Sequence, residues 1–229
     1  MDVKETPEEV EEIISRVLAE GAPPEQFHLL GREWELHSGV FPATMTAATE
    51  VMASIVPYPV HGRFLEVGSG SGVIAVTAAL HGCAEVTAVD ISEAAVANTK
   101  ANAARHFVAD RVEAGLSDLF QGVSPDRRFD VIFWNVPWTY VHPGYSLRSS
   151  LHAAVFDPGY QNQARYIAEG PRYLAPNGRL FIGTADLGER DRLDELANAA
   201  GRRILPARVV RRQEVHRLME YQLLEVLPR

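Results

Sequence analysis

An alternation of short apolar runs with stretches of helical periodicity constrains the fold of this chain more than any other feature of its sequence. Strands that alternate with helices form βαβ units, and successive units place their strands parallel in one sheet with helices on both faces. The last two apolar runs have no helix between them, so we expect them to pair as an antiparallel hairpin. The expected strands cover residues 63–68, 85–90, 111–118, 129–135, 178–185, 203–210 and 221–227, and the expected helices cover 72–82, 93–106, 160–174 and 190–201. The sequence therefore predicts an α/β fold with a doubly wound, mostly parallel, seven-stranded sheet and a C-terminal antiparallel hairpin.

The first 42 residues do not follow this pattern, and we expect them to form a small helical and hairpin cap. A Thr-Pro-Glu-Glu stretch and the apolar stripe after it predict a helix over residues 6–21. Polar and apolar residues then alternate over 27–44, as in a short hairpin or flap. We divide the chain into this cap, residues 1–42, and a main domain, residues 43–229, which begins with a helix expected over 43–55.

The charge balance of the chain narrows the classes of partner. Its 229 residues include 22 Lys and Arg against 30 Asp and Glu, which gives a formal charge of -8. A protein of this charge repels a phosphate backbone, so nucleic acid is not expected as a partner. One stretch is locally basic, and we expect it to form a solvated face rather than a binding patch. Its members are Arg202, Arg203, Arg208, Arg211 and Arg212.

Cysteine usage and apolar runs indicate the compartment. Cys83 is the one cysteine of the chain, so the sequence predicts no disulfide framework and no thiolate metal site, as in proteins of a reducing compartment. The acidic N-terminus lacks the basic and apolar regions of a secretory signal, and no apolar stretch reaches the ~20 residues of a transmembrane helix. We expect a cytoplasmic protein without a metal or a membrane partner.

A glycine-rich turn joins the first expected strand of the sheet to its helix. In "LEVGSGSGVIAV", Gly68, Gly70 and Gly72 allow a tight turn and let a ligand approach the backbone N–H groups at the start of a helix. Nicotinamide and flavin enzymes use a similar turn, so the glycines alone do not identify the ligand. Here the spacing is G-x-G-x-G, and Glu66 precedes the first glycine by two residues. A carboxylate at this position repels a pyrophosphate but can bind an amino group.

Two further acidic residues are expected at the same edge of the sheet. Asp90 ends the strand "VTAVD", a position from which a carboxylate can bind ribose hydroxyls. Asp118 follows the next strand, where it can accept a hydrogen bond from an adenine amino group or cap a helix. A nucleoside with a cationic, amino-acid-like tail matches the three carboxylates, so we predict S-adenosylmethionine as the cofactor. Ile91 and Leu119, which follow two of these acids, complete the predicted cofactor site together with Asn135.

Four segments carry a family resemblance: "FLEVGSGSGVIAV", "VTAVDIS", "SDLF" and "FDVIFWNVPW". In this order and spacing they resemble the class I S-adenosylmethionine-dependent methyltransferases. The last segment is similar to that of the branch with an Asn-Pro-Pro-Tyr type motif, which includes the release-factor glutamine methyltransferases and enzymes that methylate amino groups of nucleic acids. The resemblance covers roughly residues 40–185, and it implies a Rossmann-like sheet and transfer of a methyl group to nitrogen.

The resemblance places the methyl acceptor at the end of the strand 129–135. Asn135 matches the asparagine of the family. Its amide oxygen and a neighbouring backbone carbonyl, here that of Val136, would accept both N–H bonds of a planar amine. Pro137 would keep the segment rigid, and Trp138 would offer a face for stacking. The predicted catalytic residues are therefore Asn135, Val136, Pro137 and Trp138.

Two of these residues depart from the family pattern. Val136 replaces the first proline, and Trp138 replaces the tyrosine. Valine restores a backbone N–H, so we expect a looser segment and a pocket whose geometry differs from that of the family. We expect Trp134, just before the motif, to pack under the sheet rather than to touch a ligand.

The segment between this motif and the next expected helix is long for a loop and rich in polar and aromatic residues, as in a substrate lid. It contains His142 and His152, and either would be a candidate general base if it faced the acceptor.

The leading hypothesis is an S-adenosylmethionine-dependent N-methyltransferase that acts on an amide or amine nitrogen of a small molecule or a protein side chain. A biosynthetic C- or O-methyltransferase and an RNA methyltransferase are the alternatives within the same class. A binding module without catalysis belongs to another class, and the joint presence of Glu66, Asp90, Asp118 and Asn135 disfavours it. A nicotinamide oxidoreductase is the last alternative, and a titration with both cofactors would separate it from the others.

Overall fold

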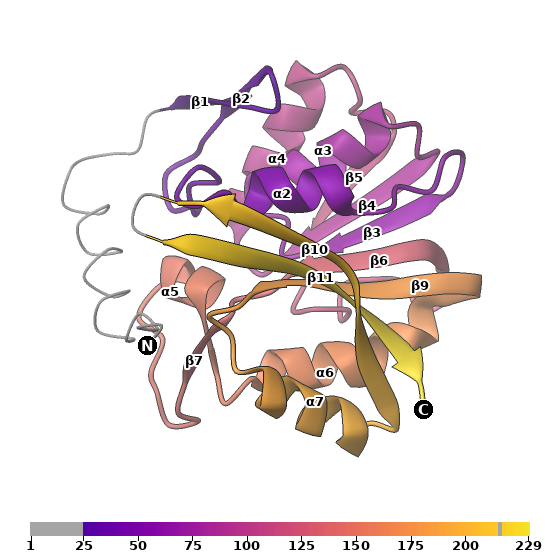
Figure 1. Ribbon diagram of the computed structural model, residues 1–229. Helices are drawn as coiled ribbons and strands as arrows, with labels where there is room; N and C mark the ends of the chain where they lie inside the picture. Colours follow the sequence, from indigo (N-terminus) through magenta and orange to yellow (C-terminus); the bar gives the residue numbers. More distant parts are fainter. Residues whose placement is uncertain (1–24, 215–216) are drawn as a thin grey trace.

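The computed structural model describes residues 25–214 and 217–229 (Figure 1). The helix expected over residues 6–21 lies outside the described residues. Seven strands form the central sheet, in the spatial order β10 (Arg202–Gln213), β11 (Leu218–Pro228), β9 (Leu174–Ala185), β6 (Phe129–Asn135), β3 (Arg63–Val67), β4 (Glu85–Asp90) and β5 (Val112–Leu116).

The direction of the strands and their order confirm the predicted fold class. The five strands from β9 to β5 run parallel, whereas β11 and β10 are antiparallel to their neighbours. From β3 the chain adds β4 and β5 on one side and then returns to add β6 on the other. The carboxyl ends of β3 and β6 therefore flank the switch point at which open α/β sheets bind ligands.

Helices cover both faces of the sheet and bury a separate core on each (Figure 1). On one face lie α2 (Ala48–Ile55), α3 (Val73–Leu80) and α4 (Glu93–Arg105); on the other lie α6 (Gln161–Glu169), the short 3-10 helix η1 (Gly170–Tyr173) and α7 (Arg190–Ala199). Every residue of α3 except Leu80 is buried, which explains why all of its residues but Thr77 are apolar. The helix expected from residue 43 begins only at Ala48.

An N-terminal hairpin of β1 (Gln26–Leu29) and β2 (Arg32–Glu35) forms where the alternation predicted it. It lies on α4, because the side chains of Asn98 and Asn102 each donate to the carbonyl of Glu35 at 2.9 Å. Trp34 is fully buried in the core that α3 and α4 share. The hairpin therefore packs into the core of the main sheet, and the division of the chain at residue 42 stays a prediction.

The segment between β6 and α6 was expected to be a loop, and the structure corrects this expectation. It contains β7 (Thr139–Val141), α5 (Ser150–Val155) and β8 (Phe156–Pro158), and β7 pairs with β8 in parallel. Val141, Leu151 and Phe156 form a small apolar cluster between these elements. Each of these elements is too short to show a recognisable periodicity of apolar residues in the sequence.

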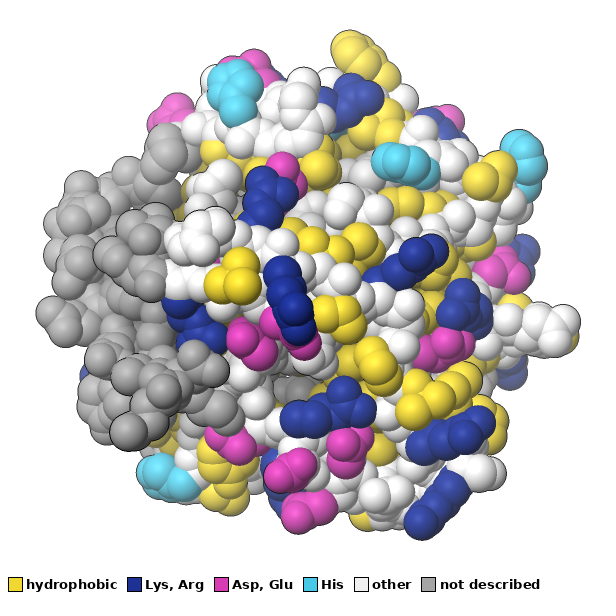
Figure 2. Space-filling view, viewed as in Figure 1, with side chains coloured by type: hydrophobic (Ala, Val, Ile, Leu, Met, Phe, Trp, Pro, Cys, Tyr) yellow, Lys and Arg dark blue, Asp and Glu magenta, His cyan; other side chains and the backbone are white. Residues whose placement is uncertain are grey.

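The basic run of β10 does not form a separate positive patch on the face shown in Figure 2. Arg211 pairs with Glu220 at 3.0 Å, and Arg212 pairs with Glu50 at 2.8 Å. Acidic and apolar side chains lie between the basic ones on this face. Two features are absent from the described residues, namely a helix long and apolar enough to cross a bilayer and a cluster of three or more His, Cys, Asp or Glu side chains suited to a metal ion.

Candidate active site

A cavity of about 540 Å³ opens at the carboxyl edge of the sheet, where the ends of β3, β4 and β6 meet. Further walls come from residues 39–49, from α5 and from the start of β11. Gly72 does not line the cavity, whereas all the other residues predicted for the site do: Glu66, Gly68, Gly70, Asp90, Ile91, Asp118, Leu119, Asn135, Val136, Pro137 and Trp138. The structure brings these residues together, whereas their individual roles stay predictions.

The glycine turn depends on left-handed backbone conformations. Gly68, Gly70 and Gly72 have φ angles of 65°, 53° and 78°. A Cβ on Gly72 would lie 2.8 Å from the Cα of Thr99 on α4, and a Cβ on Gly68 would lie 2.7 Å from Nε1 of Trp134 on β6. The turn is packed between α4 and β6, so only glycine fits at these two positions.

Gly72→Ala is expected to lower the free energy of unfolding by about 2–4 kcal/mol, since it adds both backbone strain and a clash with α4. Gly70 provides a matched control: its φ is 53°, but a Cβ there meets nothing within 4 Å. Gly70→Ala should therefore cost only about 1–2 kcal/mol of strain. Urea unfolding of the two variants measures the difference, and equal losses would contradict the close packing of Gly72 on α4.

Two carboxylates flank the glycine turn and are largely withdrawn from water. Glu66 accepts a hydrogen bond from the N–H of Ala75 at 2.8 Å, and Asp90 accepts from the N–H groups of Gly70 and Ser92, each at 2.9 Å. Burial raises the pKa of Glu66 well above its usual range and also raises the pKa of Asp90. Each carboxylate keeps acceptor capacity toward the cavity. An ammonium group and ribose hydroxyls would satisfy this capacity, so the residues present fit the two ends of S-adenosylmethionine.

Asp118 has a partner that sequence reasoning missed. Both of its carboxylate oxygens accept from Nη1 of Arg165 on α6, at 2.9 and 3.0 Å. The two residues are 47 positions apart, and no local pattern links them. Asp118 still lines the cavity, and its contact with adenine stays a prediction.

Asn135 ends β6 with an amide oxygen that lacks a partner. Its Oδ1 is buried and accepts no hydrogen bond within the described part of the chain, and the residue lines the cavity. A Cβ on Gly183 would come within 3.1 Å of this oxygen, so the glycine on β9 makes room for it. Leaving a buried acceptor unpaired costs roughly 1–3 kcal/mol and is rare in native proteins. The arrangement therefore indicates a place for a hydrogen-bond donor.

Val136 does not loosen the segment, and our expectation on this point is wrong. Its N–H donates to the carbonyl of Gly183 at 3.0 Å, which continues the ladder between β6 and β9 beyond Asn135. A proline would lack this donor. Valine at this position therefore adds a contact that fixes the backbone.

The two tryptophans lie in different surroundings. Trp134 is buried as expected and packs against Tyr166, with 5.3 Å between ring centroids, yet it also lines the cavity. Trp138 forms an edge-to-face pair with Tyr221 of β11, with ring centroids 6.4 Å apart, and both residues line the cavity. Sequence reasoning missed Tyr221, because it reaches the site only through the fold of the C-terminal hairpin.

The two candidate histidines do not face the cavity. Nδ1 of His142 accepts from the N–H of Gly144 at 3.2 Å, and Nδ1 of His152 accepts from the N–H of Arg148 at 3.0 Å. Neither residue lines the cavity, and no other described histidine does. The structure therefore gives no support to a histidine general base among the described residues.

Comparisons with known proteins agree with this geometry. A glycine turn flanked by acidic residues, at the switch point of a doubly wound sheet, is the arrangement expected of a class I S-adenosylmethionine-dependent methyltransferase. Residues 33–200 match the family described as the methyltransferase small domain, and the chain belongs to this family.

Curated relatives share stretches of this sequence, and a solved structure shares its fold. The chain is 42% identical over 90 residues to the release factor glutamine methyltransferase of Koribacter versatilis (strain Ellin345), covering 39% of this chain and 31% of that protein. It is 34% identical over 136 residues to a putative protein N5-glutamine methyltransferase of Methanocaldococcus jannaschii, covering 58% of this chain and 66% of that protein. The matches thus span less than two thirds of these relatives. A solved methyltransferase from Pyrococcus furiosus has the same fold, with a TM-score of 0.63 at 17% identity over 97% of this chain and 98% of that chain.

Proposed function

We propose that this methyltransferase transfers the methyl group of S-adenosylmethionine to the nitrogen of a primary carboxamide, and that the carboxamide is a glutamine side chain of a protein. The observation that carries this proposal is a pair of unoccupied hydrogen-bond acceptors at the end of β6. Two acceptors match the two N–H bonds of a planar NH2 group.

The two acceptors are the oxygens of the segment Asn135–Trp138 that have no hydrogen-bond partner among the described residues. The carbonyl of Pro137 accepts from Nε2 of Gln163 at 3.0 Å, and the carbonyl of Trp138 accepts from the hydroxyl of Tyr160. The carbonyl of Val136 accepts no hydrogen bond among the described residues. Oδ1 of Asn135 is likewise unpaired there. Asn135 and Val136 both line the cavity, so we infer that these two oxygens can accept from a donor bound there.

Both acceptors would act on the nitrogen as it reacts. When bound, the cofactor supplies a methyl group on a positively charged sulfur. The acceptor nitrogen would use its lone pair to bond the methyl carbon, the electrons of the carbon–sulfur bond would leave with sulfur, and the nitrogen would then give one proton to water. Positive charge develops on the NH2 group, so oxygens that accept its N–H bonds stabilise the transition state and align the lone pair.

The choice of acceptor rests on chemistry and on the relatives. A formal charge of -8 disfavours RNA as the acceptor. The names of the two curated relatives specify glutamine methylation, in one case of a release factor and in the other of a protein. Both names support a glutamine side chain of a protein as the methyl acceptor.

A peptide library tests the proposal. The enzyme is incubated with S-adenosylmethionine that carries a deuterated methyl group and with peptides that contain one glutamine among random neighbours. A matched library replaces the glutamine by glutamate. Mass spectrometry should find the label on the glutamine side-chain nitrogen and nothing in the glutamate library. Label on oxygen, on carbon or on lysine would contradict a carboxamide nitrogen as the methyl acceptor. If RNA is added and only the RNA is labelled, the acceptor is RNA rather than protein.

A further inference from the structure

The segment Val136–Trp138 is fixed by contacts to three residues on neighbouring elements. Gly183 on β9 accepts from the N–H of Val136, and side chains from the start of α6 donate to the next two carbonyls. Each of the three residues after Asn135 therefore has one backbone group in a hydrogen bond, and the partner is a different residue each time.

Gln163 reaches this segment from the first turns of α6. It is 1% exposed, and its side chain donates to the carbonyl of Pro137 at 3.0 Å. Its backbone N–H donates to Oδ2 of Asp157 at 2.9 Å, and Oδ1 of Asp157 accepts from the N–H of Asn162 at 3.1 Å. Asp157 is fully buried and binds free N–H groups at the start of α6. Gln163 is thus fixed through both its backbone and its side chain.

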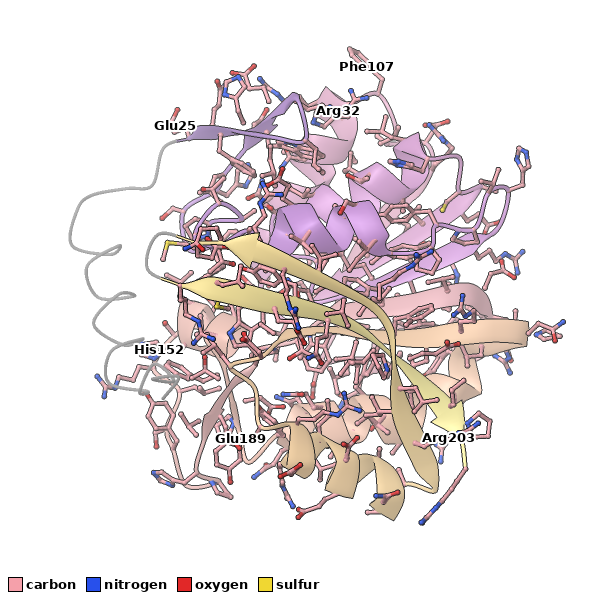
Figure 3. All side chains as sticks on the ribbon, viewed as in Figure 1. Glu25, Arg32, Phe107, His152, Glu189 and Arg203 are labelled. Atoms are coloured by element: carbon pink, nitrogen blue, oxygen red, sulfur yellow. The ribbon has the colours of Figure 1, made fainter. Side chains whose placement is uncertain are left out.

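Tyr160 binds the other end of the segment. Its hydroxyl donates to the carbonyl of Trp138 and accepts at 3.0 Å from the N–H of Glu189, which is labelled in Figure 3 just before α7. Tyr160 is 2% exposed, and its φ of 55° lies in the left-handed region that costs energy for a residue other than glycine. Such strain persists where surrounding contacts over-determine the backbone, and it is frequent at functional sites.

We propose that Gln163 and Tyr160 are positioning residues, which fix the orientation of the segment so that the carbonyl of Val136 stays available to the acceptor nitrogen. This inference rests on the proposed function. The carbonyls of Pro137 and Trp138 each accept one of these buried hydrogen bonds. Rotating either peptide plane would break its bond and leave an unpaired group, at a cost of roughly 1–3 kcal/mol. The two side chains thus supply the stiffness that a proline at position 136 would otherwise provide.

Two variants and a matched control test the inference. Gln163→Met removes the donor at similar side-chain length, and Tyr160→Phe removes only the hydroxyl. Gln161→Met is the control, because Gln161 is an exposed glutamine at the start of the same helix. Hydrogen–deuterium exchange of a peptide covering residues 133–141 reports on the segment without any acceptor. Steady-state kinetics and calorimetric titration with S-adenosylhomocysteine report on turnover and on cofactor binding.

We expect both variants to raise exchange at the Val136 amide and to lower kcat by about 10- to 50-fold, because a small misplacement of the acceptor nitrogen weakens in-line attack. The affinity for S-adenosylhomocysteine should stay within about twofold. Gln163→Glu adds a second test, since a protonated carboxyl can donate to the carbonyl of Pro137 and a carboxylate repels it. Its activity relative to Gln163→Met should rise as the pH falls through the pKa of the new carboxyl.

Wild-type exchange in both variants would overturn the positioning role, and so would raised exchange with an unchanged kcat. Equal pH profiles for Gln163→Glu and Gln163→Met would also count against it. A wild-type enzyme that methylates no carboxamide would contradict the proposed function instead, and the exchange result would still decide whether these side chains fix the segment.

Discussion

Asn135→Ala is expected to lower kcat by about a thousandfold, the upper part of the range for removing one preorganised group that stabilises transition-state charge. The amide oxygen of Asn135 is buried and unpaired among the described residues, so alanine removes an acceptor that no neighbouring group replaces. Asn135 is also predicted to contact the cofactor, but the carboxylates of that site remain in the variant, so the affinity for S-adenosylhomocysteine should fall by less than about fivefold. Single-turnover methyl transfer and calorimetric titration measure the two effects separately.

Two further variants make this result specific. Asn135→Asp keeps an acceptor oxygen at the same distance from the backbone, so it should retain more activity than Asn135→Ala. Asn198→Ala changes an exposed asparagine on α7 and should leave turnover unchanged. Wild-type turnover in Asn135→Ala, with the cofactor still bound, would show that the acceptor nitrogen is oriented by other groups.

The sheet and the outline of the site were predictable because their signals are local. Apolar strands and amphipathic helices are recognisable within short windows, and a tight turn that carries three glycines marks the junction of β3 and α3. Parallel strands end at one edge of a sheet, which brings residues from separate strands together. All four acidic and amide residues lie at or near the carboxyl ends of four different strands and line one cavity: Glu66, Asp90, Asp118 and Asn135.

The contacts that orient these residues were not predictable, because their partners are distant in the sequence and common in type. Arg165 is 47 positions from Asp118, and Gln163 is 26 positions from Pro137. Nothing in the neighbours of either residue indicates its partner. The expectation for Val136 was wrong for the same reason, since its N–H finds an acceptor on β9, a strand that sequence reasoning placed only by its apolar pattern.

Asp90→Ala is expected to weaken the binding of S-adenosylhomocysteine by about 100-fold, because hydrogen bonds to a charged group contribute roughly 1.5–3 kcal/mol each. The carboxylate lines the cavity and also accepts from the N–H of Gly70 at 2.9 Å, so its removal affects both the ribose contact and the glycine turn. Asp110→Ala is the control, since Asp110 is an aspartate whose side chain is 78% exposed. Calorimetric titration should show wild-type affinity for the control.

A cofactor analogue separates the two effects of Asp90→Ala. If the carboxylate binds the ribose hydroxyls, the wild-type protein should lose affinity for a 2′,3′-dideoxy analogue of S-adenosylhomocysteine, and Asp90→Ala should bind the analogue and the parent compound almost equally. The coupling between the two changes then measures the contact itself, apart from any loosening of the turn. If removing the hydroxyls lowered the affinity of the wild-type protein and of Asp90→Ala by the same factor, Asp90 would act on the glycine turn alone. Binding of a reduced nicotinamide cofactor in place of S-adenosylhomocysteine would contradict the predicted cofactor altogether.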